Sequence, residues 1–169
     1  MSMPPEQLSI ALRETEGEFL SQRRAIAALD FVAAGALGVV ALWQLGIVKH
    51  IPEPPPKSLF DAPKVNGSAE AYSYWGIPDA FLGVASYAVT ATLAAAGSPA
   101  RARTAPYYPL AMAAKTIVDA AQAGKLTYDS WTKYRAFCMW CLIAAGATFA
   151  TVPLALAEAK AALKTVTAS

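Results

Sequence analysis

The chain has 169 residues, of which 56% are hydrophobic and only 15% are charged, and its net charge at pH 7 is +2. A soluble domain would carry about 25% charged residues, so the composition indicates an integral membrane protein rather than a soluble enzyme. The basic residues form no continuous stripe, which argues against nucleic acid as a partner. Two cysteines are too few for a disulfide framework, and the length suits one domain of about four helices.

Residues 1–24 form a polar segment in which acidic side chains and arginines alternate with hydrophobic positions. We predict that this segment contains an amphipathic helix lying on the membrane surface. The hydrophobic run that follows is too long for the core of a cleaved signal peptide, so no cleaved signal is expected.

The first predicted membrane span covers residues 25–48 and is interrupted by Asp30 and Gln44. Asp30 lies about one and a half turns inside the span. An acidic residue at this depth is a candidate functional site. We favour the alternative that Asp30 forms an ion pair with Arg23 or Arg24, which stand at the edge of the span.

The connection after this span, residues 49–73, has four prolines within residues 52–56 and no cysteine. The prolines end the helix and favour an extended spacer. His50 is the only histidine of the protein. No second metal-ligating group accompanies it, so we interpret His50 as an interfacial side chain and expect no metal site.

The second and third predicted spans cover residues 75–97 and 105–128. Pro78 suits the first turn of the second span. The aromatic residues just before this span are typical of a membrane interface. Lys115 and Asp119 are four residues apart in the third span and can pair on one face. We favour a structural ion pair facing the bundle; the alternative is a role in binding a proton or a ligand.

The fourth predicted span covers residues 136–157, contains no charged residue, and includes Pro153, which predicts a kink. Residues 159–169 form a polar tail. The predicted fold is therefore an all-α membrane protein, a four-transmembrane-helix bundle over residues 25–158 with an amphipathic N-terminal segment.

Cys138 and Cys141, the only cysteines, stand at the start of the fourth span. Residues three apart on a helix share a face, and a helix N-terminus favours a thiolate. The spacing therefore predicts a redox-active pair within disulfide distance. The alternative is that both cysteines are small apolar fillers in a membrane helix.

Two passages resemble a known family. Tyr74–Gly83 (YWGIPDAFLG) is similar to the F-G-I-P-x-A-x-x-G start of the second helix in bacterial homologues of vitamin K epoxide reductase. Residues 126–128 and 136–142 are similar to the L-x-Y and F-C-x-W-C-L elements between its third and fourth helices. The resemblance extends over residues 25–157, and the order of the four spans agrees with the four-helix bundle of that family.

The resemblance implies a membrane thiol–quinone oxidoreductase whose Cys-x-x-Cys pair lies beside a pocket for ubiquinone or menaquinone, held without a covalent bond. Cys141 would attack the quinone and Cys138 would exchange with a second cysteine pair in the first connection, which a thioredoxin-like partner reduces. It also implies that four residues near the mouth of the pocket contact the quinone: polar Tyr72 and Ser73, and the rings of Trp75 and Phe81.

The chain departs from the family because residues 49–73 hold no shuttle cysteines. We favour a quinone-linked oxidoreductase whose relay thiols sit on a separate protein. The alternative is a non-catalytic accessory subunit of a larger respiratory or photosynthetic membrane complex. A pore or transporter has little support, because no inverted repeat is visible.

The orientation is predicted from arginines at the membrane edges. Arg23 and Arg24 flank the first span, and Arg101 and Arg103 follow the second on the same side. Basic residues favour the cytoplasm, which predicts a multi-pass protein in the lipid of a bacterial inner membrane with both termini cytoplasmic. The Cys-x-x-Cys pair would then face the oxidising compartment.

Overall fold

The computed structural model describes residues 4–14 and 16–168. Within this part of the chain all regular elements are helical, apart from one isolated bridge between Phe60 and Phe137. The four long helices are α2 (Leu20–Gln44), α4 (Asp79–Ala95), α6 (Tyr107–Asp129) and α7 (Met139–Thr167). The short elements are α1 (Pro5–Glu14), α3 (Ala62–Asn66), η1 (Ala69–Tyr72), α5 (Arg101–Thr104) and η2 (Ser130–Tyr134).

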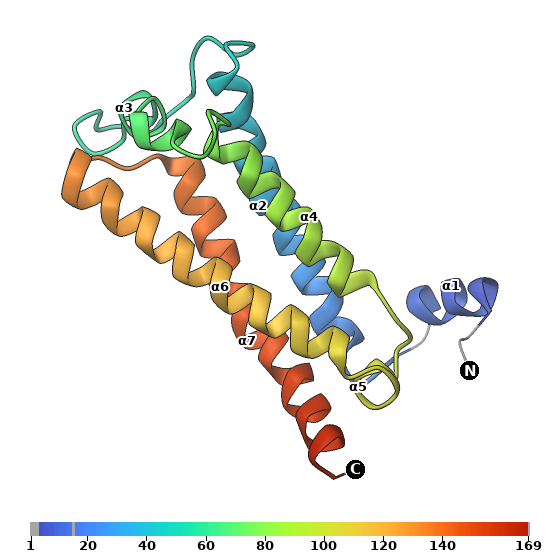
Figure 1. Cartoon of the computed structure of the whole chain (residues 1–169). Coiled ribbons are helices and arrows are strands. Elements are labelled where there is room, and N and C mark those ends of the chain that lie inside the picture. Colours follow the sequence, from blue (N-terminus) through green and yellow to red (C-terminus); the bar gives the residue numbers. More distant parts are fainter. Residues whose placement is uncertain (1–3, 15, 169) are drawn as a thin grey trace.

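The four long helices run side by side and form the body of the molecule (Figure 1). Helix α2 packs against α4 and α7, and α6 packs against α7, whereas α4 and α6 share far fewer contacts. The connection between α2 and α4, residues 45–78, covers one end of the bundle. Helix α5 and both ends of the chain lie toward the other end (Figure 1).

The structure confirms an all-helical fold with a helix at each of the four predicted places. Helices α2 and α7 are long and apolar enough to cross a membrane, and α4 is a shorter apolar helix of 17 residues. Crossing by all four helices remains a prediction. A helix, α1, lies within the predicted N-terminal segment, and the polar tail continues α7 to Thr167.

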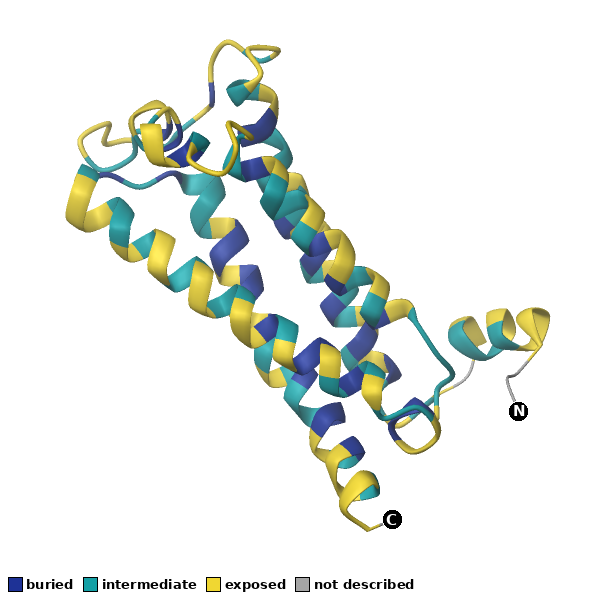
Figure 2. Ribbon diagram, in the orientation of Figure 1, coloured by how far each residue is buried: buried dark blue, intermediate teal, exposed yellow. Residues whose placement is uncertain are grey.

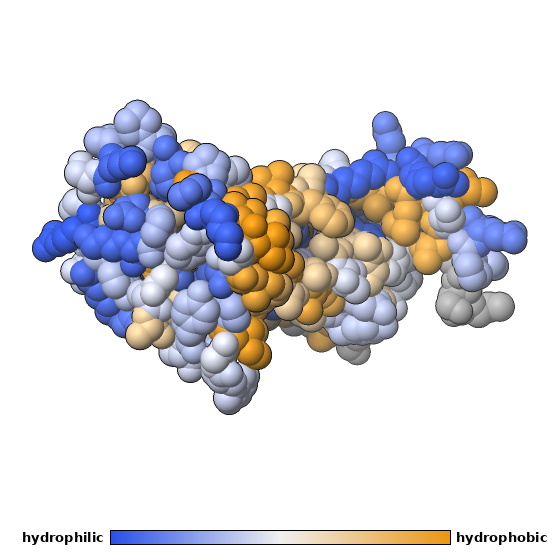
Figure 3. Space-filling model, turned by 90° about the horizontal axis from the view of Figure 1, so that it is seen from above, coloured by the Kyte–Doolittle hydropathy of each residue, from blue (hydrophilic) through white to orange (hydrophobic). Residues whose placement is uncertain are grey.

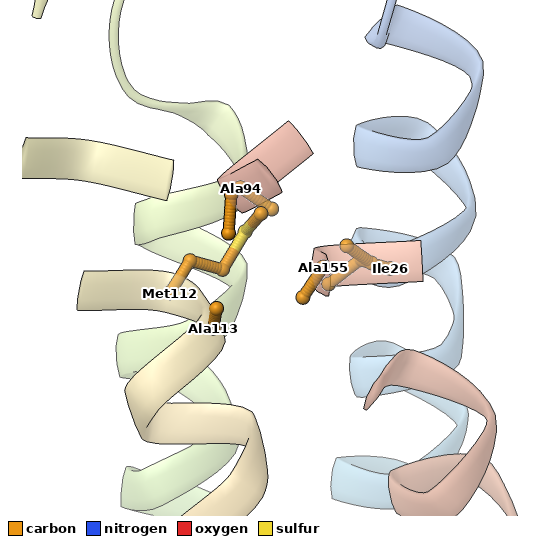
Figure 4. Packing of buried hydrophobic residues seen from close by; sticks show 6 residues of the cluster. Ile26, Ala94, Met112, Ala113 and Ala155 are labelled. Carbon is orange, nitrogen blue, oxygen red and sulfur yellow. The ribbon is translucent and has the colours of Figure 1, made fainter. Parts of the chain in front are cut away.

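Small side chains dominate the interior of the bundle. One cluster toward the α5 end consists of Ile26, Ala94, Met112, Ala113, Ala155 and Ala159. Figure 4 shows Met112 reaching from α6 toward Ala94 on α4. Alanines at the contact faces let the helices approach closely, as small residues do in membrane bundles. The buried residues follow the inner faces of the helices and the exposed ones face outward (Figure 2).

The outer faces of the helices carry large hydrophobic side chains. Phe31, Val118 and Phe149 are all exposed, on α2, α6 and α7. Viewed from above, hydrophobic side chains gather in the middle of the visible face, between hydrophilic groups at its two sides (Figure 3). An exposed apolar surface of this kind is what a helix bundle presents to lipid.

Two buried arginines fasten the α5 end of the bundle. The guanidinium of Arg23 donates to the backbone oxygens of Ala94 at 2.7 Å and of Ser98 at 3.0 Å, and to carbonyls between them. Arg101 forms a fully buried ion pair with Glu158 at 2.6 Å and also donates to carbonyls at the end of α4. The arginines therefore satisfy acceptors that a helix C-terminus leaves without partners.

The predicted ion pair of Asp30 with an adjacent arginine is wrong for Arg23. The end of α4 offers that guanidinium a row of unsatisfied carbonyls, and it donates five hydrogen bonds to them. Arg24 donates to the backbone oxygen of Leu12 at 2.7 Å. Asp30 is 3% exposed, and its Oδ2 atom has no hydrogen-bond partner among the described residues.

Candidate functional site

The site begins where the α2–α4 connection docks onto the segment before α7. The amide of Asp61 donates to the carbonyl of Phe137 at 2.9 Å, and the amide of Phe137 donates to the carbonyl of Leu59 at 2.8 Å. Before this bridge, Arg135 adopts a left-handed conformation with φ of 51° and ends η2. The chain then runs extended along the connection and delivers Cys138 to the start of α7.

Cys138 is the N-cap residue of α7, with φ of −103° and ψ of 121°. It therefore precedes the helix, and the prediction that both cysteines lie on the helix is wrong in this detail. Its Sγ atom accepts the amide hydrogen of Cys141 at 3.3 Å. Hydrogen bonding by Cys141 lowers the pKa of the Cys138 thiol, although burial opposes this shift. Both thiols are free.

Cys141 lies in the first turn of α7 and belongs to a partly buried polar network. Its Sγ donates to Oδ1 of Asn66 at 3.3 Å. The amide of Asn66 donates in turn to the carbonyl of Ala62 at 3.0 Å, which fixes the side chain. Gln44 donates to the backbone oxygen of Asn66 at 3.1 Å and to Oδ1 of Asp79 at 2.9 Å. The network joins α2, α3, α4 and α7 around one thiol.

The proline-rich part of the connection holds the first turn of α7. Glu53 accepts the amide hydrogen of Met139 at 3.1 Å, and Trp140 donates its indole N–H to the carbonyl of Pro52 at 3.0 Å. A carboxylate at a helix N-terminus is favourable because the amide groups there lack partners. Burial is the largest influence on Glu53 and raises the pKa of its carboxyl, which also interacts with Cys138.

A second set of hydrogen bonds, which we call the clasp, joins the connection to η2 after the end of α6. Glu70 in η1 accepts from Lys133 at 2.6 Å and from the hydroxyl of Tyr134 at 3.0 Å, both in η2. These hydrogen bonds lower the pKa of the Glu70 carboxyl. Glu70 and Tyr134 line the mouth of the cavity described next, so the clasp forms part of its rim.

A cavity of about 360 Å³ lies inside the bundle below the connection, and both cysteines line it. Its walls are mainly apolar and come from all four long helices and the connection. Besides Glu70, Tyr134 and other polar residues of the lining, two sets of polar side chains matter for the chemistry. Asn66 and Asp79 stand near the thiols, while Ser86, Asp119 and Gln122 lie farther along α4 and α6.

The four residues predicted to contact a quinone do not line this cavity. Tyr72 donates instead to the carbonyl of Gln44 at 3.4 Å, and Ser73 donates to the carbonyl of Glu70 at 2.8 Å. Trp75 has a φ of 54° in the turn before α4, and the residue is 90% exposed. Phe81 is 38% exposed because the preceding residue, Ala80, takes the inward position on α4.

The sequence did not predict Asn66, Gln44 or Asp79 as site residues. Asn66 was visible only as part of a turn signal, Asn66-Gly67, and Gln44 only as an interruption of the first span. The predicted pairing of Lys115 with Asp119 is confirmed, with a distance of 2.5 Å. No group of three or more metal-ligating side chains occurs within residues 4–14 and 16–168, and His50 lies outside the cavity lining.

Comparison with protein-family models shows the family to which the chain belongs. The model of the vitamin K epoxide reductase family matches residues 24–156, which is more than half of the sequence. The chain belongs to the vitamin K epoxide reductase family. Members of this family are membrane thiol oxidoreductases that work with quinones, and the two long apolar helices agree with a membrane protein. Neither the curated proteins nor the solved structures yield a match.

Proposed function

We propose that this member of the vitamin K epoxide reductase family is a thiol–quinone oxidoreductase that uses Cys138 and Cys141. The observation that carries the proposal is that both sulfurs line one mainly apolar cavity inside a helix bundle. An apolar cavity with a few polar groups is the usual form of a small-molecule site. A lipid-soluble quinone, either ubiquinone or menaquinone, fits such a cavity.

The reaction would transfer two electrons from the sulfurs of Cys138 and Cys141 to the quinone, and the sulfurs would form a disulfide. The quinone would take up two protons and become a hydroquinone: one proton comes from the Cys141 thiol and the second from solvent, because Cys138 reacts as a thiolate. Cys141, held by Asn66, would attack the quinone ring. Cys138, whose thiolate is favoured, would then attack the sulfur of Cys141, release the hydroquinone and complete the disulfide.

Reduction of that disulfide would require a thiol from outside the chain. The α2–α4 connection contains no cysteine, and it covers Cys138, which is 1% exposed. A thioredoxin-like protein would have to reach past this cover, whereas a small dithiol could enter the cavity. We therefore expect dithiothreitol to support quinone reduction better than a large protein donor.

We place the protein in a bacterial inner membrane as a multi-pass protein with both termini in the cytoplasm. Both termini lie toward the end of the bundle opposite the α2–α4 connection (Figure 1), which supports their being on one side. The Cys-x-x-Cys end would then face the oxidising compartment, where disulfides persist.

Quinone reduction by the purified protein tests the proposal. With dithiothreitol as donor, the wild type should convert a short-chain quinone to its hydroquinone, and Cys141→Ser should abolish the conversion. Cys138→Ser should stop turnover but retain an adduct between quinone and Cys141, visible as a new absorption band. Ser98→Ala, far from the cavity, serves as a control and should keep full activity.

The second candidate function is a non-catalytic subunit of a larger membrane complex. The observation favouring it is that Ala62 of the connection packs in the same buried cluster as Cys138, so no relay thiol faces the pair. Absence of quinone reduction with any dithiol, together with intact assembly of Cys141→Ser into a complex, would overturn the enzyme proposal and support this one.

A further inference from the structure

The cavity has a second polar end that the thiol chemistry does not use. Ser86 on α4 and Asp119 and Gln122 on α6 line it there. Ser86 and Asp79 are seven residues apart on α4, which corresponds to about 10 Å along the helix. Polar groups therefore stand at both ends of an apolar space. A quinone headgroup of one or two rings would fill this space, and the polar side chains at each end would extend to reach its oxygens.

Asp119 is held in place from several directions. Its Oδ1 accepts from Ser86 at 3.1 Å, and its Oδ2 accepts from Lys115 at 2.5 Å and from Thr90 at 3.4 Å. Lys115 also donates to the hydroxyl of Ser86 at 2.6 Å. An ionised carboxylate has about four acceptor positions, and three are used here. One acceptor position therefore remains for a group in the cavity.

Gln122 supplies the complementary donor. It follows Asp119 by three residues, so the two side chains share a face of α6. Its amide makes no hydrogen bond to any described residue. By contrast, the amide of Gln44, in the polar network around Cys141, donates two. Gln122 is an exposed residue that also lines the cavity, so its amide is accessible to a ligand there.

We infer that Gln122 and Asp119 form a binding subsite for the quinone oxygen remote from the thiols. The inference rests on the proposed function, because it concerns the ligand of the same cavity. An oxidised quinone oxygen can only accept hydrogen bonds, and it would accept from the amide of Gln122. A hydroquinone hydroxyl can also donate, and it would donate to Asp119. One subsite thus serves both redox forms of the ligand.

A purely structural role for these residues is the competing explanation. Lys115, Asp119, Ser86 and Thr90 link α6 to α4, which otherwise share few contacts. That explanation accounts for Asp119 but not for Gln122, which links nothing in the described part of the chain. The decisive variant is therefore at Gln122.

Binding of a short-chain ubiquinone provides the test, measured by quenching of tryptophan fluorescence in detergent. The full chain carries Cys138→Ser and Cys141→Ser, so that no reaction follows binding. Adding Gln122→Met, which preserves side-chain length, should weaken quinone binding about tenfold by removing one hydrogen bond. The matched control Ala121→Met places the same side chain on the neighbouring residue outside the lining and should leave affinity unchanged.

Asp119→Asn should weaken binding of the reduced, hydroquinone form more than that of the quinone. Unchanged affinity in Gln122→Met, while the parent binds, would overturn the inference and leave the proposed function standing. No binding by the parent would overturn the proposed function and this inference together. Thermal unfolding of each variant identifies any loss of affinity that comes from misfolding, and such a loss at Gln122→Met would favour the structural explanation.

Discussion

At the start of α7, Cys138 and Cys141 differ in surroundings although three residues separate them. Cys138 is an extended N-cap residue whose sulfur accepts a backbone amide, while the Cys141 thiol donates to Asn66. An acceptor position favours a thiolate and a donor position favours a thiol. The pair is therefore polarised, with Cys138 as the better nucleophile toward sulfur.

The ionisation of Cys138 gives a prediction at this scale. Because hydrogen bonding lowers its pKa, Cys138 should ionise at a lower pH than an unperturbed thiol and become protonated as the pH falls through this lowered pKa. Ultraviolet thiolate absorbance of the reduced protein should show this early step. Cys138→Ser should remove it, and Cys141→Ala should move it to higher pH by removing the interaction with the Cys141 side chain, while the backbone amide of residue 141 remains. A first titration step at the usual thiol pKa in the wild type would contradict this.

Pattern alone could identify some residues and not others. The cysteine spacing and the pairing of Lys115 with Asp119 are local along one helix, so the sequence predicts them. Asn66 and Glu53 acquire their roles from tertiary contacts of a connection without regular spacing. The outward positions of Trp75 and Phe81 depend on the turn before α4. In this turn Trp75 is itself left-handed, which no sequence pattern predicted.

Among the elements, the α2–α4 connection matters most for the site. It contributes an N-terminal acceptor to α7 through Glu53, a bridge to Phe137, and Ala62 in the buried cluster that contains Cys138. The sequence predicted a connection over residues 49–73, shorter than the observed 45–78, and it did not predict the docking of this connection, because pairing between distant segments leaves no periodic signal. The helices were easier, since long apolar runs mark them directly.

The presence of Ala62 and Cys138 in one buried cluster predicts an engineered disulfide. In a Cys141→Ser background, Ala62→Cys should form a disulfide with Cys138 under mild oxidation, since both residues lie in one buried cluster. Peptide mapping by mass spectrometry would detect it. Ala71→Cys, also buried but outside that cluster, is the matched control and should not cross-link. A free thiol at both positions would show that the connection is not docked as described.

For the whole molecule, the arrangement of the four long helices gives the bundle two different ends. The connection and the thiols lie at one end, and α5 and the buried Arg101–Glu158 pair lie at the other. The sequence predicted the four helices and their order. It could not predict the buried ion pair, because Arg101 and Glu158 are distant along the chain and only packing brings them together.

Topology can be measured in intact cells. In a background without native cysteines, Ser58→Cys should react with a membrane-impermeant maleimide, because the connection is predicted to face outward. Ser98→Cys should remain unlabelled until the cells are opened, since it lies at the α5 end. The reverse pattern would invert the orientation, and labelling at both sites would show that α4 does not cross the membrane.

The closed α5 end has a consequence for bioenergetics. The cluster around Met112, Arg23 and the Arg101–Glu158 ion pair occupy the bundle there, whereas the lining of the cavity lies toward the connection. Protons and electrons entering or leaving the cavity would therefore exchange with a single compartment. Turnover should then be electroneutral, and imposing a potassium diffusion potential on proteoliposomes should not alter the rate of quinone reduction. A rate that rises or falls with the potential would reveal charge movement through the α5 end.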